Sequence, residues 1–157
     1  MGQQEIPEIV MYTDGAARGN PGPGGYGVVL MSGTHRKELS QGFRLTTNNR
    51  MELMAAIAGL EALRVVPCRV TIYTDSKYVA DSVVKGWLFN WVKTHFKGKK
   101  NIDLWKRFLE VYPKHQIRFI WVKGHASIPE NERCDELAVA ASYQPVLLED
   151  IGYQPDK

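Results

Sequence analysis

The tripeptide Tyr-Thr-Asp occurs twice in this chain, at residues 12–14 and 73–75, each time closing a run with β-strand character. A glycine or a serine, which interrupts a strand, follows each aspartate. If the two strands are parallel neighbours, Asp14 and Asp75 lie at the same edge of one sheet. Such a pair of carboxylates is costly without a cation, because like charges repel. Each ending taken alone is also an ordinary strand-terminating turn.

The pattern of strands and helices around these endings predicts an α/β fold. Three strands, expected at 6–14, 26–31 and 37–43, are joined by short links and favour an antiparallel meander. The strand at 69–75 follows a helix that opens at 46–49, so it should run parallel to a neighbour. The full order, βββαβα(αα)βα, predicts a mixed five-stranded sheet with helices on its faces. The remaining elements are expected at 76–85, 87–94, 102–111, 116–122 and 130–142.

A glycine-rich segment lies directly after the first Tyr-Thr-Asp. Residues 15–25 include five Gly and two Pro, a composition that argues against any regular element and predicts a loop. No Gly-Lys-Ser/Thr follows this segment and no helix begins after it, so it does not have the pattern of a phosphate-binding P-loop.

The chain as a whole has the size and composition of one globular domain. Its 157 residues are 44% hydrophobic and 24% charged, with a formal net charge of +3. We expect a single domain over residues 1–157, with a core at 6–143 and a weakly structured C-terminal tail. The N-terminus lacks the pattern of a signal peptide, no apolar run is long enough to span a bilayer, and the two cysteines fit neither a disulfide framework nor a zinc site. We therefore expect a cytoplasmic protein without membrane contact, and a monomer.

Two further acidic residues join the two aspartates as candidates. Glu52 lies in the first turn of the helix that opens at 46–49, where Asn49 and Glu52 can alternatively form a capping box. Asp135 lies three positions before Ala138 on the last predicted helix, so it is expected on or near the inward face of that helix. A carboxylate on a buried face needs a partner.

Three or four carboxylates without a Cys/His cluster favour a hard cation, Mg²⁺ or in its place Mn²⁺. Two such ions about 4 Å apart would clamp an in-line phosphoryl displacement. His125 lies in a Gly-His-Ala loop before the last predicted helix. Such a histidine is an ordinary surface residue when it stands alone. Beside a metal site it could transfer a proton near neutral pH.

A basic and aromatic stretch is the second candidate feature. Between residues 85 and 107 there are seven cations and one acid, together with three of the four Trp residues. Basic side chains mixed with aromatic ones suit a nucleic-acid backbone and its sugars. The alternative is a solvated connection between helices whose aromatic side chains belong to the core. The local charge favours a polyanionic partner.

Six stretches of the chain together resemble bacterial type I ribonuclease H, in the family's order and over nearly the whole length. They are Tyr-Thr-Asp-Gly at 12–15, the glycine-rich 19–27, Thr-Thr-Asn-Asn-Arg-Met-Glu-Leu at 46–53, Tyr-Thr-Asp-Ser at 73–76, Trp-Val-Lys-Gly-His at 121–125, and 129–138. The resemblance implies an RNase H-like fold. It also implies an endonuclease that uses metal ions, most simply two, to hydrolyse the RNA strand of RNA–DNA hybrids, leaving 5′-phosphate and 3′-hydroxyl ends. The catalytic and metal-binding carboxylates would be Asp14, Glu52, Asp75 and Asp135, with His125 handling protons.

The resemblance further implies a set of contacts to the hybrid. Three Asn residues, at 20, 48 and 49, fall where the family contacts the minor groove, which displays the 2′-hydroxyls. Thr47 and Asn101 fall at the family's DNA-phosphate pocket. Tyr78 and Trp87 fall in its DNA-strand channel, and residues 87–100 fall at its basic protrusion. Lys77 stands where Gln is more usual. The implied contacts are Asn20, Thr47, Asn48, Asn49, Lys77, Tyr78, Trp87, Lys93, Lys97, Lys99, Lys100 and Asn101.

Two other functions share part of this pattern. One is a nucleic-acid-binding module that retains the fold without cleaving, which the presence of all four acids and the histidine disfavours. The other is a nuclease of the same architecture that acts on duplex DNA or junctions. The three Asn residues and the basic aromatic stretch argue against it.

Overall fold

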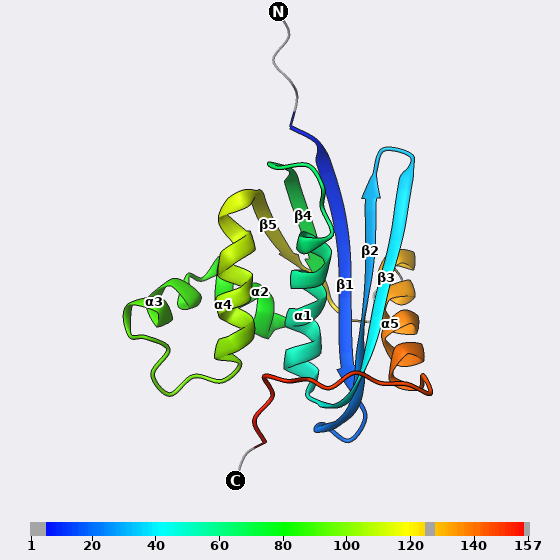
Figure 1. Cartoon of the computed structure of the whole chain (residues 1–157). Coiled ribbons are helices and arrows are strands. Elements are labelled where there is room, and N and C mark those ends of the chain that lie inside the picture. Colours follow the sequence, from blue (N-terminus) through cyan, green and yellow to red (C-terminus); the bar gives the residue numbers. More distant parts are fainter. Residues whose placement is uncertain (1–5, 125–127, 156–157) are drawn as a thin grey trace, which may run out of the picture.

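The computed structural model describes residues 6–124 and 128–155, and it arranges them as a sheet with helices on both faces (Figure 1). The strands are β1 (Glu8–Ala17), β2 (Gly22–Ser32), β3 (His35–Thr46), β4 (Arg69–Thr74) and β5 (Gln116–Trp121). The helices are α1 (Asn48–Glu61), α2 (Lys77–Val84), α3 (Trp87–Lys93), α4 (Ile102–Val111), the short 3-10 helix η1 (Tyr112–Lys114) and α5 (Pro129–Ser142). The element order agrees with the predicted order, apart from the added 3-10 turn.

The five strands follow the order β3-β2-β1-β4-β5. The pairs β1–β2 and β2–β3 are antiparallel, whereas β1–β4 and β4–β5 are parallel. In the β1–β4 register Tyr12 is the partner of Tyr73, and their rings stack with centroids 4.9 Å apart. The predicted mixed sheet, a meander extended by parallel strands, is therefore confirmed, and the two Tyr-Thr-Asp endings lie side by side.

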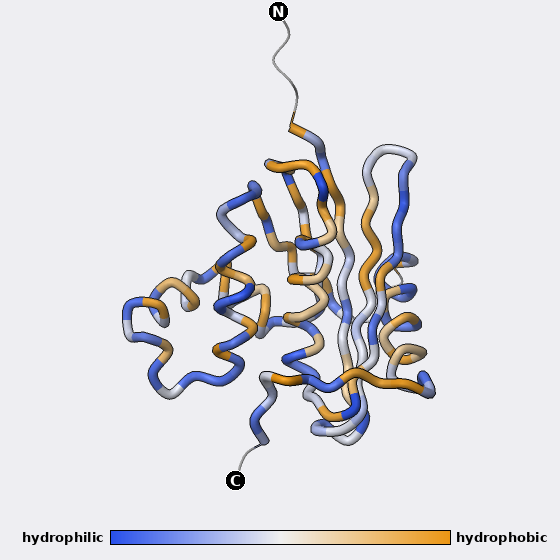
Figure 2. The backbone as a smooth tube through the Cα atoms, viewed as in Figure 1, coloured by the Kyte–Doolittle hydropathy of each residue, from blue (hydrophilic) through white to orange (hydrophobic). Residues whose placement is uncertain are grey.

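Helices cover the two faces unequally. In Figure 1, α1 and α4 pack on one face and α5 lies on the other, against β1, β2 and β3. Leu53, Ile57 and Leu60 of α1 are fully buried, as are Trp105 and Phe108 of α4. The first half of β3, in contrast, is hydrophilic (Figure 2), because this edge strand is exposed to solvent. Among the described residues, no helix has the length and apolar character needed to cross a bilayer.

The prediction of a loop over residues 15–25 is wrong. Strand β1 continues to Ala17 and β2 begins at Gly22, so only residues 18–21 turn between them. Two of the glycines allow helices to approach the sheet closely: Gly15 meets α1, and Gly25, together with Gly27 just beyond this segment, meets α5. A Cβ at Gly27 would lie 2.3 Å from the Cys134 carbonyl oxygen, and one at Gly25 would lie 2.6 Å from that of Ala138.

The C-terminal tail crosses the end of the sheet and is tied to α1 by a buried arginine. Leu148 forms a β-bridge with Phe43. Arg50 of α1 binds Asp103 of α4 and Asp150 of the tail, each at 2.7 Å, and both Arg50 and Asp150 side chains are 2% exposed. Arg50 and Asp150 form a buried ion pair, and Asp103, whose side chain is 41% exposed, completes a triad on the same guanidinium. The first turn of α1, the start of α4 and the tail are thereby joined at one point.

Candidate functional site

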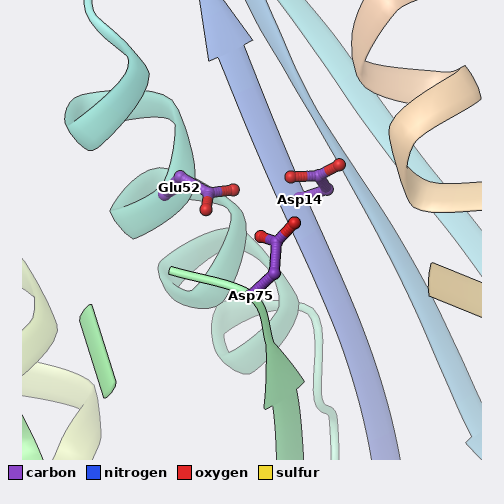
Figure 3. A group of neighbouring side chains, drawn as sticks. All are labelled: Asp14, Glu52 and Asp75. Atoms are coloured by element: carbon purple, nitrogen blue, oxygen red, sulfur yellow. The ribbon is translucent and has the colours of Figure 1, made fainter. Parts of the chain in front are cut away.

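Three carboxylates from separate elements meet at the edge of the sheet (Figure 3). Asp14 lies on β1, Glu52 on α1, and Asp75 directly after β4. Each offers a ligand oxygen, and these oxygens all lie within 4.8 Å of one another. We call these three residues the carboxylate cluster.

The strand register brings the two aspartates together. Because Tyr12 is paired with Tyr73 in the parallel β1–β4 ladder, the residues two positions further along each strand lie at the same edge. The Gly15 N–H donates to Asp14 Oδ1 at 2.9 Å and helps to orient that side chain. The main chain of Asp75 is held by Trp121 of β5, whose indole Nε1–H donates to the Asp75 carbonyl oxygen at 2.9 Å.

Glu52 joins the cluster because of how α1 begins. The N-cap of α1 is Thr47, whose hydroxyl accepts from the Arg50 N–H at 3.2 Å. The alternative of a capping box between Asn49 and Glu52 is therefore wrong, because the helix starts at Asn48. Glu52 points to the sheet edge instead, and its carboxylate is 8% exposed with no hydrogen-bond partner for Oε1.

The cluster has perturbed acid–base properties. Burial raises the pKa of Asp14 from 3.8 to about 7, against a hydrogen bond with Glu52 that lowers it, and the charge of Asp75 raises it further. Burial and then the charge of Asp14 hold the pKa of Glu52 well above its ordinary value. Without a cation, Asp14 and Glu52 retain protons near neutral pH.

The chemistry of the cluster fits a hard cation. All three donors are carboxylate oxygens, which Mg²⁺ and Mn²⁺ prefer, and the buried Glu52 Oε1 lacks any other partner among the described residues. An unpartnered buried acceptor is costly unless something binds to it. The cluster can therefore bind a divalent metal ion.

Asp135 and His125 are the two predicted catalytic residues that are not part of the carboxylate cluster. Asp135 of α5 was expected on or near the inward face of that helix; it is exposed, so it does not lie on the buried face itself. α5 buries Asn131, Cys134 and Ala138 against the sheet, and Asp135 lies about 100° around the helix from Cys134. Asp135 still contributes to the raised pKa of Asp14 through its charge. His125 lies outside the described residues.

A cleft of about 760 Å³ collects more than half of the predicted hybrid contacts near the start of α1. The predicted residues in its lining are Asn20, Thr47, Asn48, Asn49, Lys99, Lys100 and Asn101. The tail supplies another wall through residues 152–155, whose position was not predicted from the sequence. The weak pattern of the tail held no signal for this position. The lining does not include the carboxylate cluster.

Two of the Asn side chains in this lining are held by backbone N–H groups. The Ala17 N–H donates to Asn48 Oδ1 at 2.7 Å, and the Asn48 N–H donates to Asn20 Oδ1 at 3.0 Å. Both amide oxygens are thus used within the protein. Each side chain keeps its NH₂ group for donation outward.

The other predicted contacts lie around α2, α3 and the loop after it. The Tyr78 hydroxyl accepts from Asn101 Nδ2 at 3.1 Å and from Trp105 Nε1 at 2.8 Å. Trp87 is exposed, and so are Lys93 and Lys97. Trp105 is fully buried, as expected for an aromatic of the core. Lys77 has its ammonium 4.8 Å from the centroid of the Trp121 ring.

Comparisons with known proteins agree with one another. A family model described as RNase H matches residues 7–143. A ribonuclease H of Desulforamulus reducens is 57% identical over 151 residues, which cover 93% of this chain and 94% of that protein. One of Trichodesmium erythraeum is 55% identical over 152 residues, covering 94% of this chain and 96% of that protein.

Solved structures of RNase H1 proteins also resemble this chain. LC9-RNase H1, a type 1 RNase H with the type 2 active-site motif, has a TM-score of 0.80 and 29% identity, with 90% of this chain and 74% of that chain covered. LC11-RNase H1, solved in complex with an RNA/DNA hybrid, has a TM-score of 0.60 and 27% identity, covering 85% of this chain and 95% of that chain.

Proposed function

The chain belongs to the ribonuclease H family and is a ribonuclease H enzyme, and we propose that it hydrolyses the RNA strand of RNA–DNA hybrids to 5′-phosphate and 3′-hydroxyl ends. The observation that carries this proposal is the cluster of Asp14, Glu52 and Asp75, with its unpartnered Glu52 oxygen, on the same molecule as a cleft lined by amides and lysines. A related RNase H1 has been solved with an RNA/DNA hybrid, which supports the substrate class.

Asp14, Glu52 and Asp75 would hold Mg²⁺, or Mn²⁺ in its place, and Asp135 would complete the ligands for a second ion. Such a cation lowers the pKa of an attacking water and neutralises charge that develops on the phosphate oxygens. Asp14, at the end of β1, is our candidate for a ligand shared by two ions. We assign to His125 the transfer of a proton near the leaving group.

Recognition of the hybrid would come from the cleft and the basic region. The amide NH₂ groups of Asn20 and Asn48 can donate to acceptors in the minor groove, because their oxygens are already used within the protein. Asn49 would contact the same groove, Thr47 and Asn101 a phosphate of the DNA strand, and Tyr78 and Trp87 its sugars. The lysines at 93, 97, 99 and 100 add cations along the backbone. We further propose that one domain, acting as a monomer in the cytoplasm, suffices for this function.

The test is cleavage of a labelled hybrid by the purified protein with Mg²⁺. Asp14→Asn and Asp75→Asn should each reduce kcat by more than about 10³-fold, because each removes charge from the cation site. Glu132→Gln, which changes one exposed carboxylate on α5, is the control and should retain activity. His125→Ala should cost less than Asp75→Asn, about 10²-fold.

The same assay separates the alternatives. RNA that stays intact after long incubation with folded protein, while the hybrid binds, would mean a binding module rather than a nuclease. Equal cleavage of duplex DNA in a substrate panel would assign the other nuclease function. Equal losses for His125→Ala and Asp75→Asn would make the histidine a ligand or a structural residue.

A further inference from the structure

Trp121 connects the carboxylate cluster to a lysine. Its indole N–H donates to the Asp75 carbonyl oxygen at 2.9 Å, and the Lys77 ammonium lies 4.8 Å from the centroid of its ring. Trp121 is the last residue of β5 and is paired with Thr74, so its ring stands beside the residues that follow β4. The hydrogen bond fixes the indole, and the indole offers a face on which a cation can rest.

Neither the Trp121 ring nor the Lys77 side chain belongs to the hydrophobic core. Trp121 is 42% exposed, unlike Trp105, which is fully buried in the core. Lys77 is the first residue of α2, at the positive end of the helix dipole, where a cation is disfavoured. A lysine that lies at this end of the helix and rests on an exposed ring is better placed to bind an external anion than to stabilise α2.

The position of the pair indicates which anion that is. Lys77 follows Asp75 by two residues, and Trp121 holds the main chain of Asp75 itself. A nucleic-acid strand that crosses the carboxylate cluster therefore carries its phosphates past Lys77. A lysine ammonium is a point charge that binds a phosphate without base preference.

We propose that Lys77, seated on the Trp121 ring, forms a phosphate-binding subsite for the strand that crosses the carboxylate cluster. The subsite rests on the proposed function for the identity of that strand. The predicted role of Lys77 as a substrate contact thus becomes an ionic contact to the phosphate backbone. Trp121 is a positioning residue in this arrangement, because it acts through Lys77 and Asp75.

The experiment measures salt dependence with two readouts. The first is the dissociation constant of a fluorescent RNA–DNA hybrid in EDTA, and the second is kcat/KM for the same hybrid with Mg²⁺, each from 0.05 to 0.5 M KCl. For Lys77→Gln, the slope of log affinity against log salt should fall in magnitude by about 0.8, the contribution of one phosphate contact. Such a slope corresponds to about sixfold weaker binding near 0.1 M salt and to no difference near 1 M.

Matched variants assign the effect to the seated cation. Lys37→Gln removes an exposed lysine of β3 near the β2–β3 turn and should leave both slopes unchanged. Trp121→Phe retains a ring without the N–H and should preserve most of the slope, whereas Trp121→Leu should reproduce the loss in Lys77→Gln. The double variant Lys77→Gln/Trp121→Leu should lose no more slope than either change alone.

The outcomes distinguish this subsite from the proposed function. Equal slopes for Lys77→Gln and Lys37→Gln in an active protein would overturn the subsite alone. A loss in Lys77→Gln that Trp121→Leu does not share would overturn the role of the ring as a seat. A wild-type protein that shows the expected slopes in binding but never cleaves would overturn the proposed function and leave the subsite standing.

Discussion

At the scale of single residues, Asp14 shows how the site conflicts with stability. Its pKa rises from 3.8 to about 7 in the folded protein, mainly through burial. A carboxyl with a raised folded pKa binds its proton more tightly when folded than when unfolded. The metal-free folded state therefore loses stability as pH rises from about 4 to 7, and a bound cation would reverse that loss.

Asp14→Asn should stabilise the metal-free protein above pH 7. The amide carries no charge to bury, so the gain should be on the order of 2–4 kcal/mol at pH 8 and should vanish near pH 4. Urea unfolding in EDTA at the two pH values measures it. Added Mg²⁺ should raise the stability of the wild type more than that of the variant. A variant less stable than wild type at pH 8 would contradict the assignment of burial as the cause.

Residue types were easier to predict than residue surroundings. The acids at 14, 52 and 75 were predicted as one group and do lie together. Asp135 was predicted on or near the inward face of α5, but it is exposed, because a residue three positions from buried Ala138 lies about 60° around the helix from it. The sheet glycines let the side of α5 with Cys134 and Ala138 approach.

At the scale of elements, the contact between β1 and α1 sets the geometry of the cluster. A Cβ at Gly15 would lie 2.3 Å from the Met51 carbonyl carbon and 2.4 Å from the Glu52 nitrogen. These are backbone atoms of the turn that carries Glu52. The close approach of the two elements therefore holds Glu52 beside Asp14.

Gly15→Ala should damage both stability and activity. The added methyl group has only backbone to displace, so we expect a loss of about 1–3 kcal/mol and about 10²-fold in kcat as Glu52 shifts. Gly59→Ala is the matched control in the same contact. Its Cβ would meet the flexible Met11 thioether, 2.6 Å away at Sδ, and alanine favours a helix interior. Denaturation and hybrid cleavage measure the pair, and equal effects would show that the contact does not position Glu52.

At the scale of the whole molecule, Arg50 joins parts that are distant in the sequence. It binds Asp103 of α4 and Asp150 of the tail, and Thr46 also donates to Asp150 at 2.7 Å. The same junction lies behind the cleft, whose lining includes Arg50, Asp103 and residues 152–155. The tail is therefore part of the folded unit and of the cleft wall.

Asp150→Asn should destabilise the protein by about 2–4 kcal/mol, because it removes one charge from a buried ion pair. The adjacent Glu149→Gln is the control. Its pair with Arg44 is exposed, at 66% and 69%, so its loss should cost no more than about 0.5 kcal/mol. Urea unfolding at pH 7 compares them. A similar, small cost for both would show that the tail is not held by this triad.

The amino-acid sequence by itself determined the element order, the strand endings that carry Asp14 and Asp75, and the mixed sheet. Hydrophobic period and turn residues are local, and they specify which segments form strands or helices and which can be parallel neighbours. The overlap with the family pattern then identified the acids. The sequence was therefore sufficient to predict these parts of the fold and the carboxylate cluster.

Only the tertiary structure decided the rest. The strands run on through residues 15–17 and 22–25, where Gly15 packs against the first turn of α1 and Gly25 against α5. Glu52 meets Asp14 and Asp75 at the sheet edge and does not form the alternative capping box. The tail is held by the ion pair between Asp150 and Arg50, and Trp121 lies between Asp75 and Lys77. Each of these depends on contacts between segments far apart in the chain, and such contacts leave no period in the local sequence.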